Sequence, residues 1–524
     1  MRDSTAAAGK APKPERHVEI AVVGAGPAGL AAALAAADGG ASVLLVDENP
    51  IAPGLMALDV PLHFGQRMNA AVQNQSRMVE RLVDTNPGIA EAFDRGIAVE
   101  LGVTAWGAYM NGPSVGSVAR PLLGLADETR SWMISFDRLI VAAGARDLGL
   151  GFPGWEKPGV MGVQAASLLL KRYQAFDGRR LVVLGSGPAG LRFALDAKAA
   201  GLDVAAVVEV GETPQGPVDL VHRLAVAGIP LLTRRLPREA GGRAEVERVA
   251  LMALDGAADS EIACDTIVLA TGPVPTVELL DVLNCRLAYS AARGGYVPLT
   301  DEAGRTSTPG IYAVGDCAGF DAAALLDPTL AAHAGERTGK AAVADLRAAR
   351  TTGLDAPVVL PPGPPIGVAA AQPWLAALRR TDDNAQVCLC EEVTRRELLD
   401  LGPPRYLGCA ADARHPLDGL AGDGPLNADQ VKRLTRAGMG PCQGRRCREQ
   451  VQHLLGGPET VALASHRMPV RPLPLAVLAD RQELAAVGES WTAWFNIATQ
   501  WTPHWEPQPV PFPRPATPAD QGGK

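Results

Sequence analysis

Residues 17–29 read His-Val-Glu-Ile-Ala-Val-Val-Gly-Ala-Gly-Pro-Ala-Gly. The apolar run that ends at Val23 predicts a buried strand, and Gly24, Gly26 and Gly29 follow it at the spacing of a dinucleotide-binding turn. In such a turn the first glycine permits the tight bend, the second lets the backbone approach a pyrophosphate, and the third lets helix meet strand. We therefore predict a helix that begins at this turn, with a pyrophosphate at its positive end.

The residues after this turn complete a nucleotide-binding unit. An alanine-rich stretch predicts a helix to about Asp38, and an apolar strand over 42–46 leads to Asp47 and Glu48. An acidic residue at the end of the second strand is placed to bind the ribose hydroxyls of a dinucleotide. Asp47, with Glu48 beside it, is the predicted ribose ligand of the first nucleotide.

The same pattern returns further along the chain. Residues 180–184 and 203–208 predict two strands, with a helix to about Ala200 between them. The glycines of this second loop are Gly185, Gly187 and Gly190. Glu209 ends the second strand as the predicted ribose ligand, and no arginine follows to receive a 2′-phosphate, which favours NAD over NADP. A vestigial site and a site for an adenine nucleotide remain alternatives.

Three further apolar runs predict strands that return to these sheets. They cover residues 138–144, 265–272 and 309–316, and the third ends in Gly315 and Asp316. Strands that alternate with helices in this way indicate an α/β fold. We expect two Rossmann-like dinucleotide-binding domains, the second inserted in the first.

Two close pairs of cysteines lie near the C-terminus, in the sequences Cys388-Leu-Cys390 and Cys442-Gln-Gly-Arg-Arg-Cys447. A [2Fe–2S] cluster needs four thiolates, two for each iron. The second pair lies in a glycine-rich turn, where backbone N–H groups can approach the sulfurs and tune the potential. These four cysteines are the predicted cluster ligands.

The cysteines also admit other interpretations. A zinc site favours C-x2-4-C spacing in both halves, which C-x-C does not match, and a disulfide framework does not suit a long chain with 8 cysteines and no signal peptide. Inert thiols remain the third alternative. Cys409 lies between the two pairs and is the main competing ligand, whereas Cys264 lies in a strand-like run and is expected to be a small buried hydrophobic residue.

Composition limits the classes of function. The chain has 524 residues, 47% hydrophobic residues and a net charge of −8, so we expect several globular domains and no nucleic-acid partner. No signal peptide or apolar stretch of membrane-spanning length is found, which predicts a cytoplasmic protein. None of the 8 histidines lies in a catalytic or metal-binding motif, and His63 and His333 are isolated. No catalytic residue is therefore predicted.

Over residues 17–345 the two loops and the late Gly-Asp resemble the pyridine nucleotide–disulfide oxidoreductase superfamily. The resemblance implies FAD at the first loop, with Gly315 and Asp316 against the ribityl or phosphate part of the flavin. Disulfide reductases of that superfamily carry a redox cysteine pair in the FAD or NAD domain. Here Cys317 has no partner at a short spacing, so dithiol chemistry does not fit.

The cysteine region sharpens the resemblance. Residues 388–394 and 431–444 look like the bacterioferritin-associated-ferredoxin type of [2Fe–2S] domain, with an apparent insertion around 402–425. Behind a two-domain flavoprotein, this is similar to the A (alpha) subunits of opine oxidases, hydroxyproline dehydrogenases and hydrogen cyanide synthase. Residues 130–162 and 468–475 also resemble that group.

These observations divide the chain into predicted domains. The bounds are a disordered tail over 1–16, an FAD-binding domain over 17–155 and 290–350, an NAD-like domain over 156–289, a linker over 351–385, a small helical cluster domain over 386–457 and a C-terminal extension over 458–524. Short helices are expected around 391–399 and 428–436. The extension holds Trp491, Trp494, Trp501 and Trp505, which indicate a partner interface or packing onto the chain's own surface.

The resemblance implies an electron-transfer subunit of a heteromeric amino-acid, opine or amine dehydrogenase. Its partners would be an amino-acid-oxidase-like FAD subunit (beta) and a small ferredoxin-like subunit, with FMN at a subunit interface. Such a hetero-oligomer would be cytoplasmic or peripheral at the inner membrane face. A stand-alone NADH-dependent reductase that delivers electrons through the cluster is the main alternative, and a structural scaffold subunit is the other.

Overall fold

The computed structural model describes residues 14–51, 67–111, 118–320, 327–350, 371–401 and 415–479. Pro14–Leu478 form one compact unit, to which the contacts reported below belong. None of the helices in these ranges combines the length and the apolar composition that crossing a bilayer requires. The predictions for Cys409, His63 and the C-terminal tryptophans lie outside the described residues.

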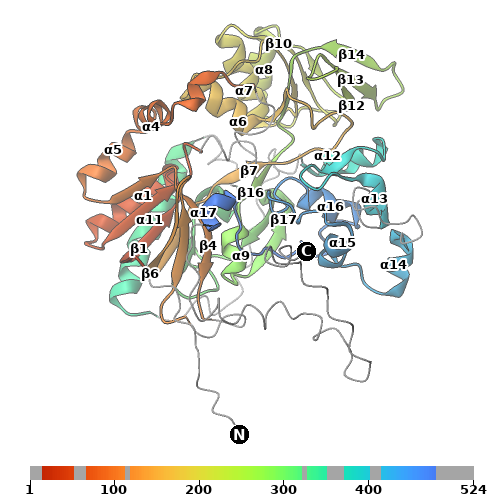
Figure 1. The fold of residues 1–524 in the computed structure, drawn as a ribbon. Coiled ribbons are helices and arrows are strands. Elements are labelled where there is room, and N and C mark those ends of the chain that lie inside the picture. The colour runs from red at the N-terminus through yellow and green to blue at the C-terminus, as the bar shows by residue number, and fades with distance from the viewer. Residues whose placement is uncertain are drawn as a thin grey trace, which may run out of the picture. The chain divides into compact units, whose positions relative to one another are not determined.

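A seven-stranded sheet carries the first glycine loop, with β3-β2-β1-β6-β5-β4 in order and β19 beside β6. Figure 1 labels β1, β6 and β4 of this sheet. The bounds are β1 Arg16–Val23, β2 Val43–Asp47, β3 Ala98–Leu101, β4 Thr104–Tyr109, β5 Leu122–Ala126, β6 Ser131–Val141 and β19 Ile311–Ala313. β1 pairs in parallel with β2 and β6, and Val23 lies beside Val46 and Val141. Because β19 also runs parallel to β6, the loops after all four strands meet at one edge of the sheet.

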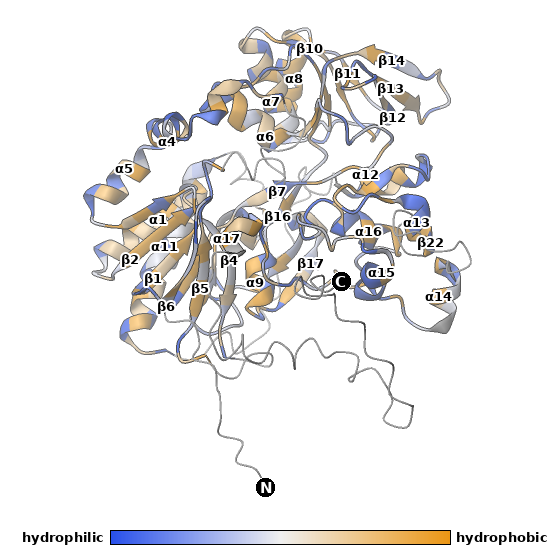
Figure 2. Cartoon of the chain, viewed as in Figure 1, coloured by the Kyte–Doolittle hydropathy of each residue, from blue (hydrophilic) through white to orange (hydrophobic). Residues whose placement is uncertain are grey.

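Two helices pack tightly on each other beside this sheet, α1 (Pro27–Asp38) and α11 (Pro328–Arg347). A Cβ at Gly335 would lie 2.0 Å from the Ala28 oxygen, and one at Gly339 would lie 2.3 Å from the Ala32 oxygen. Only glycine permits this approach. Figure 2 shows α1 in mostly apolar colours, whereas α4 (Gln75–Asp84) is strongly hydrophilic on part of its surface.

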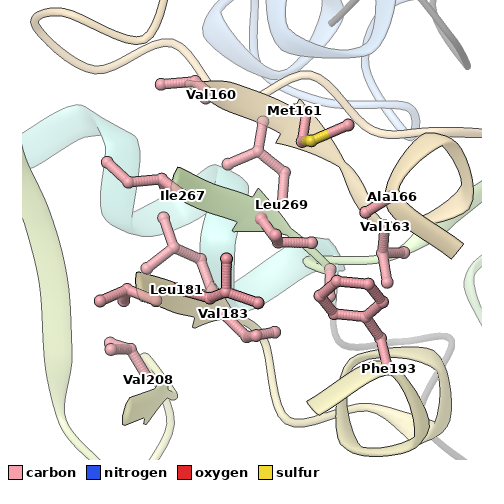
Figure 3. Close-up of a cluster of buried hydrophobic side chains, with 14 of the residues drawn as sticks. Val160, Met161, Val163, Ala166, Leu181, Val183, Phe193, Val208, Ile267 and Leu269 are labelled. Atoms are coloured by element: carbon pink, nitrogen blue, oxygen red, sulfur yellow. The ribbon is translucent and has the colours of Figure 1, made fainter. Parts of the chain in front are cut away.

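The second glycine loop belongs to a parallel sheet of five strands in the order β11-β10-β9-β15-β8. The bounds are β8 Val160–Gly162, β9 Arg180–Leu184, β10 Asp203–Val208, β11 Leu231–Leu232 and β15 Thr266–Leu269, with helices α6 Val163–Ser167, α7 Pro188–Ala199 and α8 Val218–Val226. Figure 3 shows its buried core, in which Leu181, Val183, Ile267 and Leu269 lie near Phe193 of α7. An antiparallel sheet of β12 Arg235–Gly241, β13 Arg248–Ala253 and β14 Ser260–Ala263 follows.

The chain order confirms the predicted α/β architecture with two dinucleotide-binding units. The chain leaves the first sheet after β6, builds the second sheet, and returns to the first with β19. Two short strands pair between these parts, β7 (Ala145–Asp147) and β16 (Pro273–Pro275). The second unit is therefore inserted in the first.

The remaining elements, from residue 278 to residue 479, are short. They are α9 Glu278–Val282, β17 Leu287–Ser290, β18 Gly295–Pro298, α12 Ala371–Ala377, β20 Gln386–Cys388, β21 Val393–Thr394, α13 Arg395–Leu399, β22 Asp400–Leu401, β23 His415–Pro416, α14 Leu417–Asp423, α15 Ala428–Thr435, α16 Arg448–Leu454 and α17 Leu475–Ala479. The helix predicted around 391–399 begins only at Arg395, because Thr394 and Glu397 form a capping box that fixes its start. Within the segment predicted as a linker, Trp374 of α12 is fully buried.

Candidate functional site

The three glycines of the first loop have different roles. Gly24 has φ +107°, and a Cβ there would lie 2.2 Å from the Ala142 oxygen, while a Cβ at Gly29 would lie 1.8 Å from the Gly24 oxygen. Gly26 is exposed, and no atom lies within 4 Å of the position of a Cβ. Packing of the protein therefore explains Gly24 and Gly29. The open space at Gly26 is what the backbone would need to approach a pyrophosphate.

Asp47 stands beside this loop at the end of β2. Its Oδ2 atom accepts a hydrogen bond from the Ala25 N–H at 2.6 Å, and its Oδ1 atom accepts one from the Asn49 N–H at 2.8 Å. The loop thus fixes the carboxylate at the place where the ribose hydroxyls of a dinucleotide would lie. Glu48 forms an ion pair with Arg471, and both residues line the cleft described below.

A cleft of about 280 Å³ opens in front of the loop, at the edge where the parallel strands of the first sheet end. Gly24, Gly26, Asp47, Glu48, the stretch 142–145, Glu278 and Asp316 are among the residues that line it. Gly315 has φ +75°, and burial raises the pKa of Asp316. The structure therefore brings Gly24, Gly26, Asp47, Glu48 and Asp316, five of the residues predicted for the first nucleotide, to one cleft, whereas Gly29 and Gly315 do not line it. Their assignment as FAD ligands stays a prediction.

Sequence reasoning missed many of the lining residues, and four of them show why. Gln164, Leu168 and Arg172 line the cleft from α6 and the π-helix Leu168–Arg172 that continues it. Their spacing of four residues is a helical signal that could have been recognised, and π-helical turns are frequent at functional sites. Arg471 also lines the cleft. It lies 423 residues after its ion-pair partner Glu48 in the sequence, and no local pattern reveals a contact over this separation.

The second loop differs from the first. Glu209 is 1% exposed, and its Oε2 atom accepts hydrogen bonds from the Ser186 N–H at 3.0 Å and the Ser186 hydroxyl at 2.6 Å. Its other oxygen accepts from the Gly211 N–H at 3.0 Å, and the Gln215 N–H donates to the Ser186 hydroxyl. Unlike Asp47, which accepts similar N–H groups but lines a cleft, Glu209 is buried, so a ribose could reach its carboxylate only if the residues that cover it moved. The ribose-binding role of Glu209 stays a prediction, and in this arrangement the carboxylate stabilises the loop itself.

The four predicted cluster ligands lie together. The Cys388 and Cys390 sulfurs are 3.9 Å apart, and the Cys390 and Cys442 sulfurs are 3.5 Å apart. Cys447 interacts with Cys388, so the four thiols form a string. In the described part of the chain, no three Cys, His, Asp or Glu side chains converge as ligands of one metal ion do. The string itself is what a binuclear cluster with two thiolates for each iron requires.

The protonation of these thiols fits a metal-dependent site. The hydrogen bond with Cys388 and burial raise the pKa of Cys390 to about 11, and the hydrogen bond with Cys390 and burial raise the pKa of Cys442. Without cations, four thiolates this close would repel each other. Iron would supply the positive charge that keeps them deprotonated.

The backbone around the thiols is glycine-dependent. The Gly438 N–H donates to the Cys388 sulfur at 3.4 Å, and a Cβ at Gly440 would lie 2.5 Å from the Cys390 sulfur. Cys388, Cys442 and Cys447 are buried, whereas Cys390 is half-buried. The glycine-rich turn therefore supplies close approach and an N–H donor to sulfur, both of which suit a cluster.

A family model described as pyridine nucleotide-disulphide oxidoreductase matches residues 18–343. This range covers more than half of the chain and contains both glycine loops. The chain belongs to the pyridine nucleotide-disulphide oxidoreductase family. Membership implies an FAD-dependent oxidoreductase. Cys317, which lies in the matched range, is buried, and its thiol donates to the Val141 oxygen at 3.2 Å. It therefore packs as a core residue.

Curated relatives of the chain cover nearly its whole length. It is 27% identical to the A-type subunit of opine oxidase from Agrobacterium tumefaciens (strain Ach5), over 88% of this chain and 91% of that protein. It is 26% identical to the hydrogen cyanide synthase subunit HcnB of Pseudomonas aeruginosa, over 88% of this chain and 98% of that protein. Among solved structures, L-proline dehydrogenase from P. horikoshii matches with a TM-score of 0.53 and 20% identity, over 89% of this chain and 81% of that chain. This last likeness concerns the fold alone.

Arg471 provides a test of the cleft as the flavin site of this family member. We expect Arg471→Gln to weaken FAD binding by roughly 10- to 100-fold, because one charge-assisted hydrogen bond contributes about 1.5–3 kcal/mol. Titration of the apoprotein with FAD measures the affinity. Arg235→Gln is the matched control, since Arg235 pairs with Asp255 outside the cleft. Equal affinities of both variants would show that Arg471 does not face the flavin.

Proposed function

We propose that this chain is the FAD- and [2Fe–2S]-containing electron-transfer subunit of a heteromeric dehydrogenase that acts on an amino acid, an opine or a related amine. The observation that carries the proposal is the string of four thiols and the packing of its segment. This segment packs against residues 149–151, which follow the cleft-lining stretch 142–145 in the sequence. A Cβ at Gly149 would lie 2.4 Å from the Arg446 oxygen, and the Gly151 N–H donates to the Gln450 side chain at 2.8 Å. Two redox centres in one chain would then lie on adjoining elements.

The chemistry of the two groups explains why a chain would carry both. Bound FAD supplies two-electron redox chemistry, whereas a [2Fe–2S] cluster carries one electron at a time. In this proposal the chain's own residues bind and orient the groups: the first loop and Asp47 hold the nucleotide, and Cys388, Cys390, Cys442 and Cys447 hold the irons. Substrate oxidation takes place on another subunit.

The relatives support a subunit role, since the curated proteins named above are a subunit of an opine oxidase and a subunit of a hydrogen cyanide synthase. In the proposal the partner is an amino-acid-oxidase-like FAD subunit that oxidises the substrate C–N bond. An FMN at the subunit interface and a small ferredoxin-like subunit belong to the same proposal. The extension over 458–524, with its tryptophans outside the described residues, is the proposed partner-binding region.

The NADH-dependent reductase is the main alternative function. It needs a nicotinamide nucleotide at the second loop, where Glu209 is buried and hydrogen-bonded to Ser186 and Gly211. This arrangement favours the subunit over the reductase. A scaffold subunit, the other alternative, would explain the fold but not the cluster of thiols.

The test compares the purified chain alone with the chain co-expressed with an adjacent amino-acid-oxidase-like gene product. We expect dehydrogenase turnover with an artificial electron acceptor only in the co-purified complex, and a drop of at least about 100-fold for the chain alone. Truncation before Ser490 should weaken the assembly while FAD and cluster stay bound. NADH that bleaches the flavin of the isolated chain would support the reductase, and a chain that purifies without flavin would support the scaffold. A monomeric chain that oxidises an amino acid or opine would contradict the proposal.

A further inference from the structure

A group of buried charges lies between the flavin cleft and the turn that carries Cys442 and Cys447. Glu278 lines the cleft and is 3% exposed. The Arg146 Nε–H donates to its Oε1 atom at 3.2 Å, and the Arg445 Nε atom lies 3.7 Å from the same oxygen. Arg445 belongs to the turn between the two cysteines, so one carboxylate oxygen contacts both parts of the molecule.

The charges around Glu278 keep it ionised. Burial alone would raise the pKa of Glu278, but the charge of Arg146, and then that of His466, lower it. Arg146 is itself 2% exposed and forms a second ion pair with Glu449, two residues beyond Cys447. A buried ionic group of this kind contributes little net stability compared with apolar packing, and its best-attested use is to fix one arrangement of the parts that it joins.

Contacts of Trp155 and Gly151 with Gln386 also fix the position of a cysteine-bearing segment. The Trp155 Nε1–H donates to the Gln386 oxygen at 2.6 Å, two residues before Cys388, and Trp155 is 1% exposed. A Cβ at Gly151 would lie 2.9 Å from the same oxygen. Residues 146–155 therefore hold both cysteine-bearing segments, and the charges of Glu278 and Arg445 are fixed relative to the thiols.

We propose that Arg146, Glu278 and Arg445 form a charge bridge that positions the cysteine turn on the flavin cleft and sets the reduction potential of the cluster through the opposite charges of Glu278 and Arg445. The proposal rests on the proposed function, because it requires both groups to be bound. Glu278 and Arg445 are positioning residues, since they act through charge and packing and not through contact with substrate.

The sign of each effect follows from electrostatics. An electron that enters the cluster lowers its net charge by one unit, so a nearby negative charge opposes reduction and a nearby positive charge favours it. Loss of the Glu278 charge should therefore raise the midpoint potential of the cluster, and loss of the Arg445 charge should lower it. One unit charge at about 10 Å, at an effective dielectric constant of about 20, changes the equilibrium constant of reduction roughly tenfold.

The experiment is a potentiometric titration of the purified full-length chain with dithionite as reductant, followed by EPR for the cluster and visible absorbance for the flavin. The variants are Glu278→Gln, Arg445→Gln and Arg445→Lys. The Arg445→Lys variant keeps the positive charge and should have the wild-type potential. Asp345→Asn is the matched control, because it breaks a partly buried pair with Arg305 that does not contact the cleft or the cysteine turn.

The outcomes separate this inference from the proposed function. Opposite shifts in the two Gln variants, with wild-type behaviour of Arg445→Lys and Asp345→Asn, support the bridge. Unchanged potentials, or shifts of the same sign in both Gln variants, overturn the bridge while the proposed function stands. If Glu278→Gln does not fold, the two Arg445 variants still decide. A lower potential in Arg445→Gln together with the wild-type potential in Arg445→Lys supports the bridge, and any other result overturns it. A wild-type chain without a cluster overturns both.

Discussion

Replacement of Gly26 by valine is expected to yield a folded protein that has lost its flavin. Gly26 has φ −71° and ψ 178°, which a β-branched residue adopts readily, and no atom lies within 4 Å of the Cβ position. The free energy of unfolding of the apoprotein should therefore stay within about 1 kcal/mol of the wild-type value. The new side chain would occupy the space that a pyrophosphate needs, so FAD affinity should fall at least roughly 100-fold. The flavin content of the purified protein and denaturant unfolding of the apoprotein measure the two quantities.

Gly187→Val is the corresponding change at the second loop, where Gly187 has nearly the same backbone angles, φ −67° and ψ 173°. Gly187 is buried, so denaturant unfolding of this variant is measured as well. We expect its flavin content to equal that of the wild type. Flavin lost from the Gly187 variant and kept in the Gly26 variant would reverse the assignment of the two loops. By contrast, Gly24 and Gly29 are unsuitable probes, because any Cβ there would meet backbone within 2.2 Å and disturb folding itself.

Cys442→Ser is expected to abolish the visible and EPR signature of a [2Fe–2S] centre while FAD stays bound. The Cys442 sulfur lies 3.5 Å from that of Cys390, and its removal leaves three thiols where two irons need four. The flavin cleft contains none of the four cysteines, so the flavin content should not change. Iron and acid-labile sulfide analysis gives an independent measure, and both should fall to near zero.

Two serine variants serve as controls for the ligand set. Cys264 is buried in the second sheet's core, as its sequence context predicted, and Cys264→Ser should cost stability without loss of the cluster. Cys409→Ser tests the competing ligand, which lies outside the described residues. A cluster lost in Cys409→Ser and retained in Cys442→Ser would show that the predicted ligand set is wrong.

Local patterns were sufficient for the two β–loop–α–β units. β9 and β10 have the predicted bounds, and α1 ends at Asp38 as expected, because apolar periodicity, glycine spacing and the final acidic residue are all short-range signals. That the four thiols lie together was also predictable. The spacings within Cys388–Cys390 and Cys442–Cys447 are short, so each pair is close once its segment folds. The start of α13 was misplaced, because the capping box of Thr394 outweighs the helical tendency of the glutamates before it.

Long-range contacts were not predictable in the same way. Nothing in the sequence around Arg146 indicates that it will meet Glu278 and Glu449, at separations of 132 and 303 residues. Similarly, the burial of Glu209 depends on how Ser186 and the turn after β10 pack, not on the motif itself. The motif predicts a nucleotide-binding geometry, but tertiary packing decides whether the carboxylate is accessible.

The position of Arg471 has a consequence for biosynthesis. The cleft is lined mainly by residues up to Asp316, yet Val470 and Arg471 complete it, and the Val470 N–H donates to the Trp106 oxygen at 2.8 Å. A ribosome delivers residues in order, and N-terminal parts of a chain fold first. The cofactor would therefore meet an unfinished pocket on the nascent chain. Tight binding of FAD would then require a chain synthesised at least as far as Arg471.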